Sequence, residues 1–224
     1  MINSHVHLDF STVQPIAENT VAIVPSIGQP NWANVQTYPH FALGVHPWWV
    51  EMHAQTDLQQ LERLIQRSHP IAIGECGLDY AKAIDRDTQL YFFTAQLKLA
   101  EKYNLPVIIH SVKATEDVIF LLKQYPALRG EIHAFSGSIE QANVLVKMGF
   151  YLGFGLQMTR SQSVRLTNMV QNLPLQSILI ETDDDSNPND LLRVAQAIAE
   201  IRKISLDTVV QQCDNNAISL FNLQ

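Results

Sequence analysis

The sequence has little of several features that would place the protein in a specialised class. It has only two cysteines, Cys76 and Cys213, too few for the disulfide framework of a small secreted domain, and we interpret both as buried packing residues. No apolar run approaches the roughly 18 residues that a membrane span needs. The N-terminus has no basic segment leading into an apolar one. We therefore expect no membrane span, no signal peptide and a cytoplasmic protein.

Positive charge is also scarce. The chain has 15 Lys and Arg against 22 Asp and Glu, which gives a formal net charge of −7. This balance argues against a protein that grips long nucleic acid through a basic surface. It does not argue against cleavage of nucleic acid, because bound metal ions can supply positive charge locally.

What remains is the composition of an ordinary globular protein. The 224 residues are 46% hydrophobic, with no low-complexity tract, no Ser/Gly-rich linker and no short repeat. The length suits one large α/β domain or two small ones. We expect a single domain over residues 1–224, and a monomer.

Apolar runs of strand length alternate with stretches of helical periodicity. The expected strands are Ile2–Leu8, Val21–Ile27, Phe41–Val45, Ile71–Glu75, Val107–His110, Glu131–Ala134, Phe150–Phe154 and Ile178–Glu181. The clearest helices are Arg86–Tyr103 and Leu206–Leu220, and the helix after the first strand is expected to be short. Eight strands alternating with helices predict an α/β fold of the (β/α)8 TIM-like barrel type. An open doubly wound sheet is the structural alternative.

Imidazole and carboxylate side chains stand where these apolar runs end. The set comprises His5, His7, Glu75, His110, His133 and Asp183. Polar residues at the carboxyl ends of barrel strands are typical of a barrel active site, and an open sheet would not bring these strand ends to one point. Four imidazoles and two carboxylates can ligate one or two divalent metal ions. We therefore predict that all six converge at one barrel mouth.

Each of these residues taken alone has a structural explanation. A single buried His is more often a satisfied core residue, and Glu75, between Gly74 and Cys76-Gly77, is compatible with a helix cap or a salt bridge. His5 and His7 are two apart, so on a strand both side chains point to one side. Asp183 is followed by Asp184 and Asp185 and stands nearest the strand end. The shared position of all six favours the site.

Other residues near these ends have weaker claims. His46 again follows a strand and is expected to line the pocket, whereas we interpret His40, His53 and His69 as surface residues. Trp48 and Trp49 follow His46. They either stack on a base or cap the barrel.

In these segments the chain resembles the TatD family of metal-dependent deoxyribonucleases, within the amidohydrolase-like barrels. The matching segments are 4–9, 44–48, 74–80, 96–100, 105–111, 133–137, 179–183 and 215–221, which include Ser4-His5-Val6-His7, Gly74-Glu75-Cys76-Gly77 and Glu181-Thr182-Asp183. They follow the family order over essentially the whole chain. The resemblance implies a TIM-like barrel with up to two divalent ions that hydrolyses phosphodiester bonds, often from a 3′ end.

The resemblance also assigns roles to the residues. It implies that His5, His7, Glu75 and Asp183 hold one ion, and that Glu75 bridges to a second ion held by His110 and His133. Asp183 and Glu75 are the expected catalytic residues, with Asp183 as proton acceptor. His46, Lys82, Lys113 and Arg160 are the expected substrate contacts. The chain departs from the family pattern at Val112, where an Arg is usual, and at Asp184 and Asp185, where a small residue and a Pro are usual.

Three functions compete on this basis. The first is a TatD-type deoxyribonuclease, with DNA as a transient substrate and water activated by a metal ion. The second is a metal-dependent hydrolase of a small-molecule ester, lactone or amide, which the acidic balance and Val112 favour. The third is a metal-binding barrel without catalysis. The His-rich ligand set suits Zn, Mn, Ni or Fe, while its carboxylates admit Mg.

Overall fold

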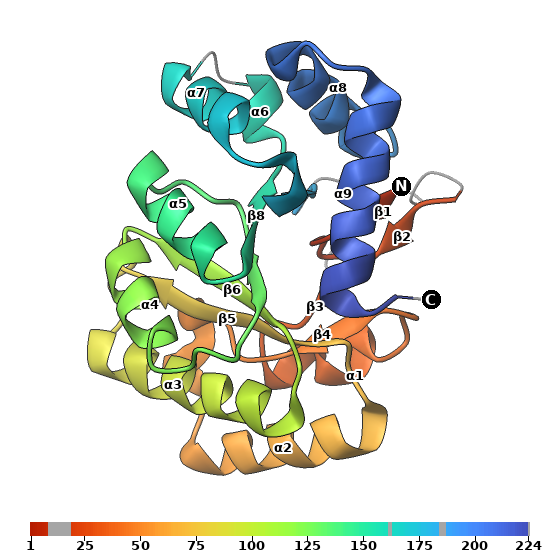
Figure 1. Cartoon of the computed structure of the whole chain (residues 1–224). Helices are drawn as coiled ribbons and strands as arrows, with labels where there is room; N and C mark the ends of the chain where they lie inside the picture. Colours follow the sequence, from red (N-terminus) through yellow and green to blue (C-terminus); the bar gives the residue numbers. More distant parts are fainter. Residues whose placement is uncertain (9–18, 161–162, 184–186, 224) are drawn as a thin grey trace.

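Short parallel strands alternate with helices around a central ring (Figure 1). The computed structural model describes residues 1–8, 19–160, 163–183 and 187–223, without the side chain of Arg160. The strands are β1 (Ile2–Asn3), β2 (Val21–Ala22), β3 (Val24–Pro25), β4 (Phe41–Leu43), β5 (Ala72–Asp79), β6 (Val107–Val112), β7 (Gly130–Ile132), β8 (Phe150–Phe154) and β9 (Ile178–Ile180). The α-helices are α1 (Trp32–Val35), α2 (Gln55–Ser68), α3 (Arg86–Tyr103), α4 (Thr115–Leu122), α5 (Ile139–Lys147), α6 (Gln157–Arg160), α7 (Val164–Asn172), α8 (Asp190–Arg202) and α9 (Leu206–Phe221). Three 3-10 helices are η1 (Gln29–Asn31), η2 (Pro47–Met52) and η3 (Leu175–Ser177).

The ring of strands is closed by the first segment of the chain. Strands β3 to β9 form one parallel sheet in chain order, and β1 pairs with β2. Backbone hydrogen bonds then join the two edges, from Ser4 N to Ile180 O (3.0 Å) and from Val6 N to Ile23 O (3.1 Å). The expected strand Val21–Ile27 is divided between β2 and β3. The eight expected segments thus form a (β/α)8 barrel, which confirms the predicted fold.

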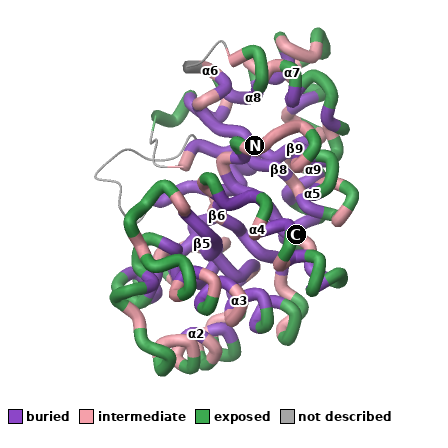
Figure 2. The backbone as a smooth tube through the Cα atoms, turned by 90° about the vertical axis from the view of Figure 1, so that its left-hand side faces the viewer, coloured by how far each residue is buried: buried purple, intermediate pink, exposed green. Residues whose placement is uncertain are grey.

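The helices cover the outside of the barrel as their periodicity predicts. Helix α3 has the predicted bounds, and Asp85 caps it by accepting a hydrogen bond from Thr88 N (2.7 Å). Helix α9 ends one residue beyond the predicted Leu220 and packs against β1 and β9. Figure 2 shows buried strands surrounded by helices with exposed outer faces. The segment expected to hold a short helix after the first strand lies largely outside the described residues.

Apolar side chains fill the barrel at the amino ends of its strands. Each of six strand segments contributes one residue to this interior layer: Ile2, Ile23, Ala42, Ala72, Ile108 and Leu179. A larger apolar cluster lies between the strands and the helices. Burial of this surface stabilises the fold by roughly 25 cal/mol per Å² of apolar area. The carboxyl ends are therefore the part of the interior left for polar side chains.

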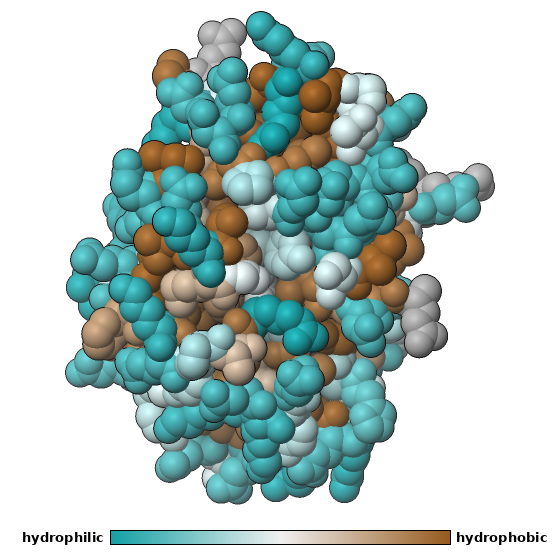
Figure 3. All heavy atoms as spheres, in the orientation of Figure 1, coloured by the Kyte–Doolittle hydropathy of each residue, from teal (hydrophilic) through white to brown (hydrophobic). Residues whose placement is uncertain are grey.

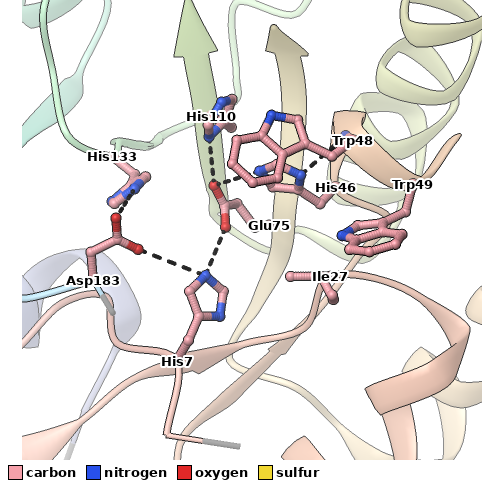
Figure 4. A pocket seen from close by; sticks show the side chains of 9 residues that line it. All are labelled: His7, Ile27, His46, Trp48, Trp49, Glu75, His110, His133 and Asp183. Atoms are coloured by element: carbon pink, nitrogen blue, oxygen red, sulfur yellow. Dashed lines mark hydrogen bonds and ion pairs between the residues drawn. The ribbon is translucent and has the colours of Figure 1, made fainter. Parts of the chain in front are cut away.

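An irregularity in β5 turns Glu75 toward the interior. Ala72 belongs to the interior layer and Ile73 to the outer cluster, so a regular strand would direct residue 75 outward. The register between β5 and β6 shifts between Ile73 and Cys76. Cys76 then packs in the outer cluster, and Glu75 faces the cavity (Figure 4). The bulge therefore aims the central carboxylate of the site.

The face drawn in Figure 3 is mostly hydrophilic, with small separate hydrophobic areas. None of the helices within the described ranges is long and apolar enough to cross a membrane.

Candidate metal centre

A cavity of about 220 Å³ opens at the carboxyl ends of the strands (Figure 4). Its lining comprises His7, Ile27, His46, Trp48, Trp49, Glu75, His110, His133 and Asp183. His5 lies fully buried beside it, with its ring stacked on that of His133 at a centroid distance of 3.6 Å. The structure therefore brings together all six residues that the strand ends singled out.

One set of donors gathers around His5. We call it the His5 cluster: His5, His7, His133 and Asp183, with one carboxylate oxygen of Glu75. His5 Nε2 lies 3.2 Å from His7 Nε2, 3.4 Å from Glu75 Oε2 and 3.7 Å from Asp183 Oδ1. His133 Nε2 lies 3.7 Å from Asp183 Oδ2.

A second set gathers around His46. We call it the His46 cluster: His46 and His110, with the other oxygen of Glu75. Glu75 Oε1 lies 3.3 Å from His46 Nε2 and 3.0 Å from His110 Nδ1. His46 was expected to contact substrate, but it lies within the donor set. His133 was expected beside His110, but its nearest donors belong to the His5 cluster.

Glu75 stands between the two clusters and shares its oxygens between them. Burial by itself raises the pKa of this carboxyl, but the surrounding imidazoles, His46 and His5 foremost, hold the pKa well below its usual value. Glu75 is therefore an anion, and its two oxygens face two different groups of imidazoles. This is the arrangement of a carboxylate that bridges two cations.

The spacing of the donors fits first-row divalent ions. Ligand atoms about 2.0–2.1 Å from a zinc ion stand about 3.3–3.4 Å apart on a tetrahedron. Within the His5 cluster, His7 Nε2 lies 3.1 Å from Glu75 Oε2 and 3.9 Å from Asp183 Oδ1. No lysine or arginine is among the described residues that line the cavity. Both the chemistry and the spacing of these residues therefore suit a metal ion.

Two further carboxylates hold the imidazoles in position. Asp79 Oδ2 lies 3.2 Å from His110 Nε2, so His110 turns its Nδ1 toward Glu75. Glu181 Oε2 lies 3.0 Å from His133 Nδ1, so His133 turns its Nε2 toward Asp183. Such partners fix the tautomer of a ligating imidazole and raise its basicity.

These carboxylates also alter the pKa values of the imidazoles. Burial lowers the pKa of His133, but the charges of Glu181 and Asp183 outweigh this and raise it well above its usual value. Burial also lowers the pKa of His110, but the hydrogen bonds to Asp79 and Glu75 outweigh it, so the pKa of His110 is raised. His5 and His46 behave in the opposite way, because burial dominates and lowers the pKa of each.

A buried acid pair that the sequence analysis missed lies beneath His133. Ser4 Oγ donates a hydrogen bond to Glu131 Oε1 (2.6 Å), and burial together with the nearby charge of Glu181 raises the pKa of Glu131 well above its usual value. A Cβ atom at Gly153 would lie 2.4 Å from Glu181 Oε2 and 2.7 Å from Glu131 Oε1, so only glycine leaves room for both carboxyls. The available signal was spacing, since Glu131 and His133 are two residues apart at the end of one apolar run, and Glu181 and Asp183 are two apart at the end of another.

Backbone contacts to the first strand fix Asp183. Asp183 N donates to His5 O (3.0 Å), and His7 N donates to Asp183 O (2.9 Å). Asp183 has a φ of 59°, in the left-handed region, which Asp enters more readily than most residues. Its side chain is 45% exposed, so Asp183 faces both the imidazoles and the solvent-filled mouth.

Only some of the residues expected to contact substrate line the cavity. Lys113 follows β6, is exposed, and is not among the described residues that line the cavity. Arg160 ends α6, with its side chain outside the description, and Asp184 and Asp185 lie outside the described residues. Trp48 and Trp49 do line the cavity.

The interpretation of His53 as a surface residue was wrong. Its side chain is 2% exposed, and Nδ1 lies 3.1 Å from Asp57 Oδ2. The ring packs beside Trp32 and Phe92, which a loop position in the sequence does not reveal.

Comparison with known proteins bears on the whole chain. The YjjV metal-dependent hydrolase of Escherichia coli is 32% identical over 253 aligned positions that cover 99% of this chain and 98% of the relative. Its crystal structure, matched at 31% identity, superposes with a TM-score of 0.92 and covers 100% of this chain and 98% of the other. A protein of Pantoea ananatis named 3′–5′ ssDNA/RNA exonuclease TatD is 30% identical over 207 positions, covering 84% of this chain and 80% of the relative.

The family profile described as TatD related DNase matches residues 2–222. This span contains the barrel, both donor clusters and the carboxylates behind them. Relatives that share it are named metal-dependent hydrolases, in keeping with a donor set built of imidazoles and carboxylates. The barrel, its donor set and the match along nearly the entire chain together show that the chain belongs to the TatD-related DNase family.

Proposed function

We propose that this protein is a 3′–5′ exonuclease of single-stranded nucleic acid that depends on one or two divalent cations. The observation that carries the proposal is Glu75, whose two oxygens face the His5 cluster and the His46 cluster separately. The name of the Pantoea relative supports the reaction and its direction. Family membership supports a metal-dependent hydrolase.

The residues have distinct roles in this proposal. His5, His7, His133 and Asp183 would hold one cation, His46 and His110 the other, and Glu75 both. Such ions would supply Lewis-acid polarisation of the phosphate and a lowered pKa for the attacking water. The His-rich set suits Zn, Mn, Ni or Fe, and the carboxylates also admit Mg.

Asp183 is the residue placed to move a proton. Its side chain is 45% exposed at the mouth, whereas that of Glu75 is 2% exposed. A carboxylate in contact with both solvent and the donor imidazoles can take a proton from the attacking water and release it to solvent. Asp79 and Glu181 keep His110 and His133 oriented throughout.

We further propose that the chain acts as a single domain, as a monomer and in the cytoplasm. The donors come from the first strand to the last, so no smaller part of the chain holds the site. The two free cysteines, Cys76 and Cys213, are both buried, as suits a reducing compartment. Light scattering coupled to size exclusion would test the monomer.

The activity has a direct test. The protein, stripped of metal and reloaded with Mn²⁺, Mg²⁺ or Zn²⁺, is given a 5′-labelled single-stranded oligonucleotide, the matching duplex, and ester, lactone and amide substrates. We expect stepwise shortening of the single strand from its 3′ end that stops with chelator. Turnover of a lactone or amide without cleavage of the oligonucleotide would favour the alternative hydrolase, and turnover after verified metal removal would contradict both.

A further inference from the structure

We propose that Trp48, Trp49 and Lys82 form a nucleobase-binding platform at the mouth of the cavity, which selects an unpaired base beside the scissile phosphate. The inference rests on the proposed function and deepens it, because it names what the site recognises besides phosphate. A base can stack on a protein side chain only after it has left the base stack of a duplex. The platform would therefore favour single strands over duplexes.

The two indoles are exposed where a buried position would be usual. Trp48 is 44% and Trp49 37% exposed, and both line the cavity that contains the donor clusters. The third tryptophan, Trp32, is buried and donates its Nε1–H to Gly44 O (2.8 Å). Adjacent exposed aromatic rings on the wall of a cavity that also contains imidazoles and carboxylates are characteristic of ligand contact rather than of core packing.

The position of Trp48 is tied to the metal donors. Its Nε1–H donates to Asp79 Oδ2 (2.6 Å), the same oxygen that lies 3.2 Å from His110 Nε2. The ring centroid is 5.1 Å from that of His46 and 6.0 Å from that of His110. Figure 4 shows the two indoles on the same side of the cavity as His46. A base held there lies next to a phosphate held at the donors.

Lys82 adds a charge to this wall. Its Nζ lies 4.0 Å from the centroid of the Trp48 ring, a cation–π contact, and the residue is exposed. A stacked base on one indole and an ammonium group over the other match a nucleotide, which carries a flat ring and a phosphate. A small neutral ester or lactone offers no such pair.

The overall charge gives stacking a larger share of the affinity. With 15 Lys and Arg in a chain of net charge −7, the composition supplies little positive charge for holding a long backbone. Single-strand-binding proteins gain affinity from stacking on aromatic side chains, which tolerates any base sequence. Lys82, as a single cationic side chain on the nucleotide, should contribute about 0.7 to the slope of log KM against log[salt].

The test uses two 5′-labelled oligonucleotides that differ only in their 3′-terminal residue, which carries either thymine or an abasic site. For the unaltered metal-loaded protein we expect kcat/KM to be on the order of 10- to 100-fold higher with the base. Trp49→Leu should bring this ratio close to one, and Trp49→Phe should retain most of it. Trp49 is preferred to Trp48 because removal of the Trp48 indole would also disturb Asp79.

A matched control and a second readout separate stacking from loss of structure. Tyr91→Leu removes a 46% exposed aromatic ring on α3 that does not line the cavity, and it should leave the ratio unchanged. Quenching of tryptophan fluorescence by thymidine monophosphate, measured without turnover, should be weaker in Trp49→Leu than in Trp49→Phe. Lys82→Met should flatten the salt dependence.

The outcomes distinguish the two proposals. If the unaltered protein cleaves no oligonucleotide under any metal, the proposed function fails and the platform fails with it. If it cleaves both oligonucleotides with equal kcat/KM, or if Trp49→Leu keeps the preference for the base, the nuclease stands and the platform is overturned.

Discussion

The His5 cluster and the His46 cluster lie on either side of one carboxylate but are built differently. The His5 cluster combines two donor groups that share His5, one with His7 and Glu75 and the other with His133 and Asp183, and backbone hydrogen bonds join Asp183 to His5 and His7. The His46 cluster has two donors besides Glu75. Of these, His46 stands after β4, at the N-cap of η2.

This difference implies different affinities for metal. A set of four or five protein donors can complete the coordination of an ion, whereas three donors leave positions for water or substrate. We infer that the His5 cluster holds its ion more tightly and that the His46 cluster holds an exchangeable one. The second ion would then be the one nearer the indoles and the substrate.

The largest expected effect is that of Glu75→Gln, because it removes the one charge common to both clusters. We expect loss of the ion at the His46 cluster, weaker binding at the His5 cluster, and a fall in activity beyond the 10- to 100-fold that changes outside the ligands cause. Elemental analysis and titration with Mn²⁺ measure this. Glu200→Gln, an exposed carboxylate on α8, is the control. Two ions and normal turnover in Glu75→Gln would reduce Glu75 to a structural residue.

Removal of the orienting carboxylates should separate the two clusters. Asp79→Asn releases His110 and should weaken the ion of the His46 cluster by about 10- to 100-fold, while Glu181→Gln should do the same to the His5 cluster through His133. Metal titration of each variant resolves the two sites by their affinities. Identical losses in both variants would show that the clusters are not independent.

The affinity for metal should depend more steeply on pH at the His5 cluster than at the His46 cluster. A cation displaces protons from its imidazoles, so affinity falls as pH falls through the pKa of each protonated ligand. The pKa is raised for His7 and His133 in the His5 cluster but only for His110 in the His46 cluster. An imidazole with a raised pKa is already protonated at a pH somewhat above the usual 6.5. As pH falls through that range, each such imidazole lowers the metal affinity by up to about tenfold per unit of pH. Calorimetry in buffers of different ionisation enthalpy should count more protons released at the His5 cluster. Equal proton release would contradict this assignment.

The smallest expected effect concerns Ala134, which follows His133 with a φ of 43°. A left-handed conformation costs an L-residue roughly 1–2 kcal/mol, and glycine avoids this at an entropic cost of about 0.5–1 kcal/mol. Ala134→Gly should therefore raise the free energy of unfolding by about 0.5–1 kcal/mol. Ala142→Gly within α5, a helical control, should lower it by more than this, because it also removes a buried methyl group worth about 0.8 kcal/mol. Denaturant titration compares the two, and a less stable Ala134→Gly variant would rule out relief of strain.

Much of the barrel could be predicted from the sequence because its information is local. Helix α3 has its predicted bounds, since an apolar face of period 3.6 and the capping Asp85 define it within 18 residues. The strands were recognised, but β5 and β6 extend beyond Glu75 and His110, to Asp79 and Val112. Their ends depend on pairing with each other, which no single segment encodes.

Six of the seven donors were proposed from the sequence, because ligands at strand ends follow from the topology of a barrel. The seventh, His46, was expected only to line the pocket and contact substrate. In the structure it lies beside Glu75 and His110, and His133 lies beside His5 and Asp183, since a donor's neighbours depend on the curvature of the sheet and on side-chain direction. The carboxylates Asp79 and Glu181 were overlooked for the same reason.

The sequence by itself determined the class of this protein: a closed α/β barrel whose strands end in imidazoles and carboxylates, within a recognisable family. The tertiary structure alone decided how those side chains act. A register shift in β5 turns Glu75 inward, a left-handed Asp183 is held against the segment that follows β1, and the indoles of Trp48 and Trp49 form one wall with donors from distant segments such as Glu75 and His110. These features arise from contacts between strands and loops distant in the chain, so a linear pattern records the residues but not their geometry.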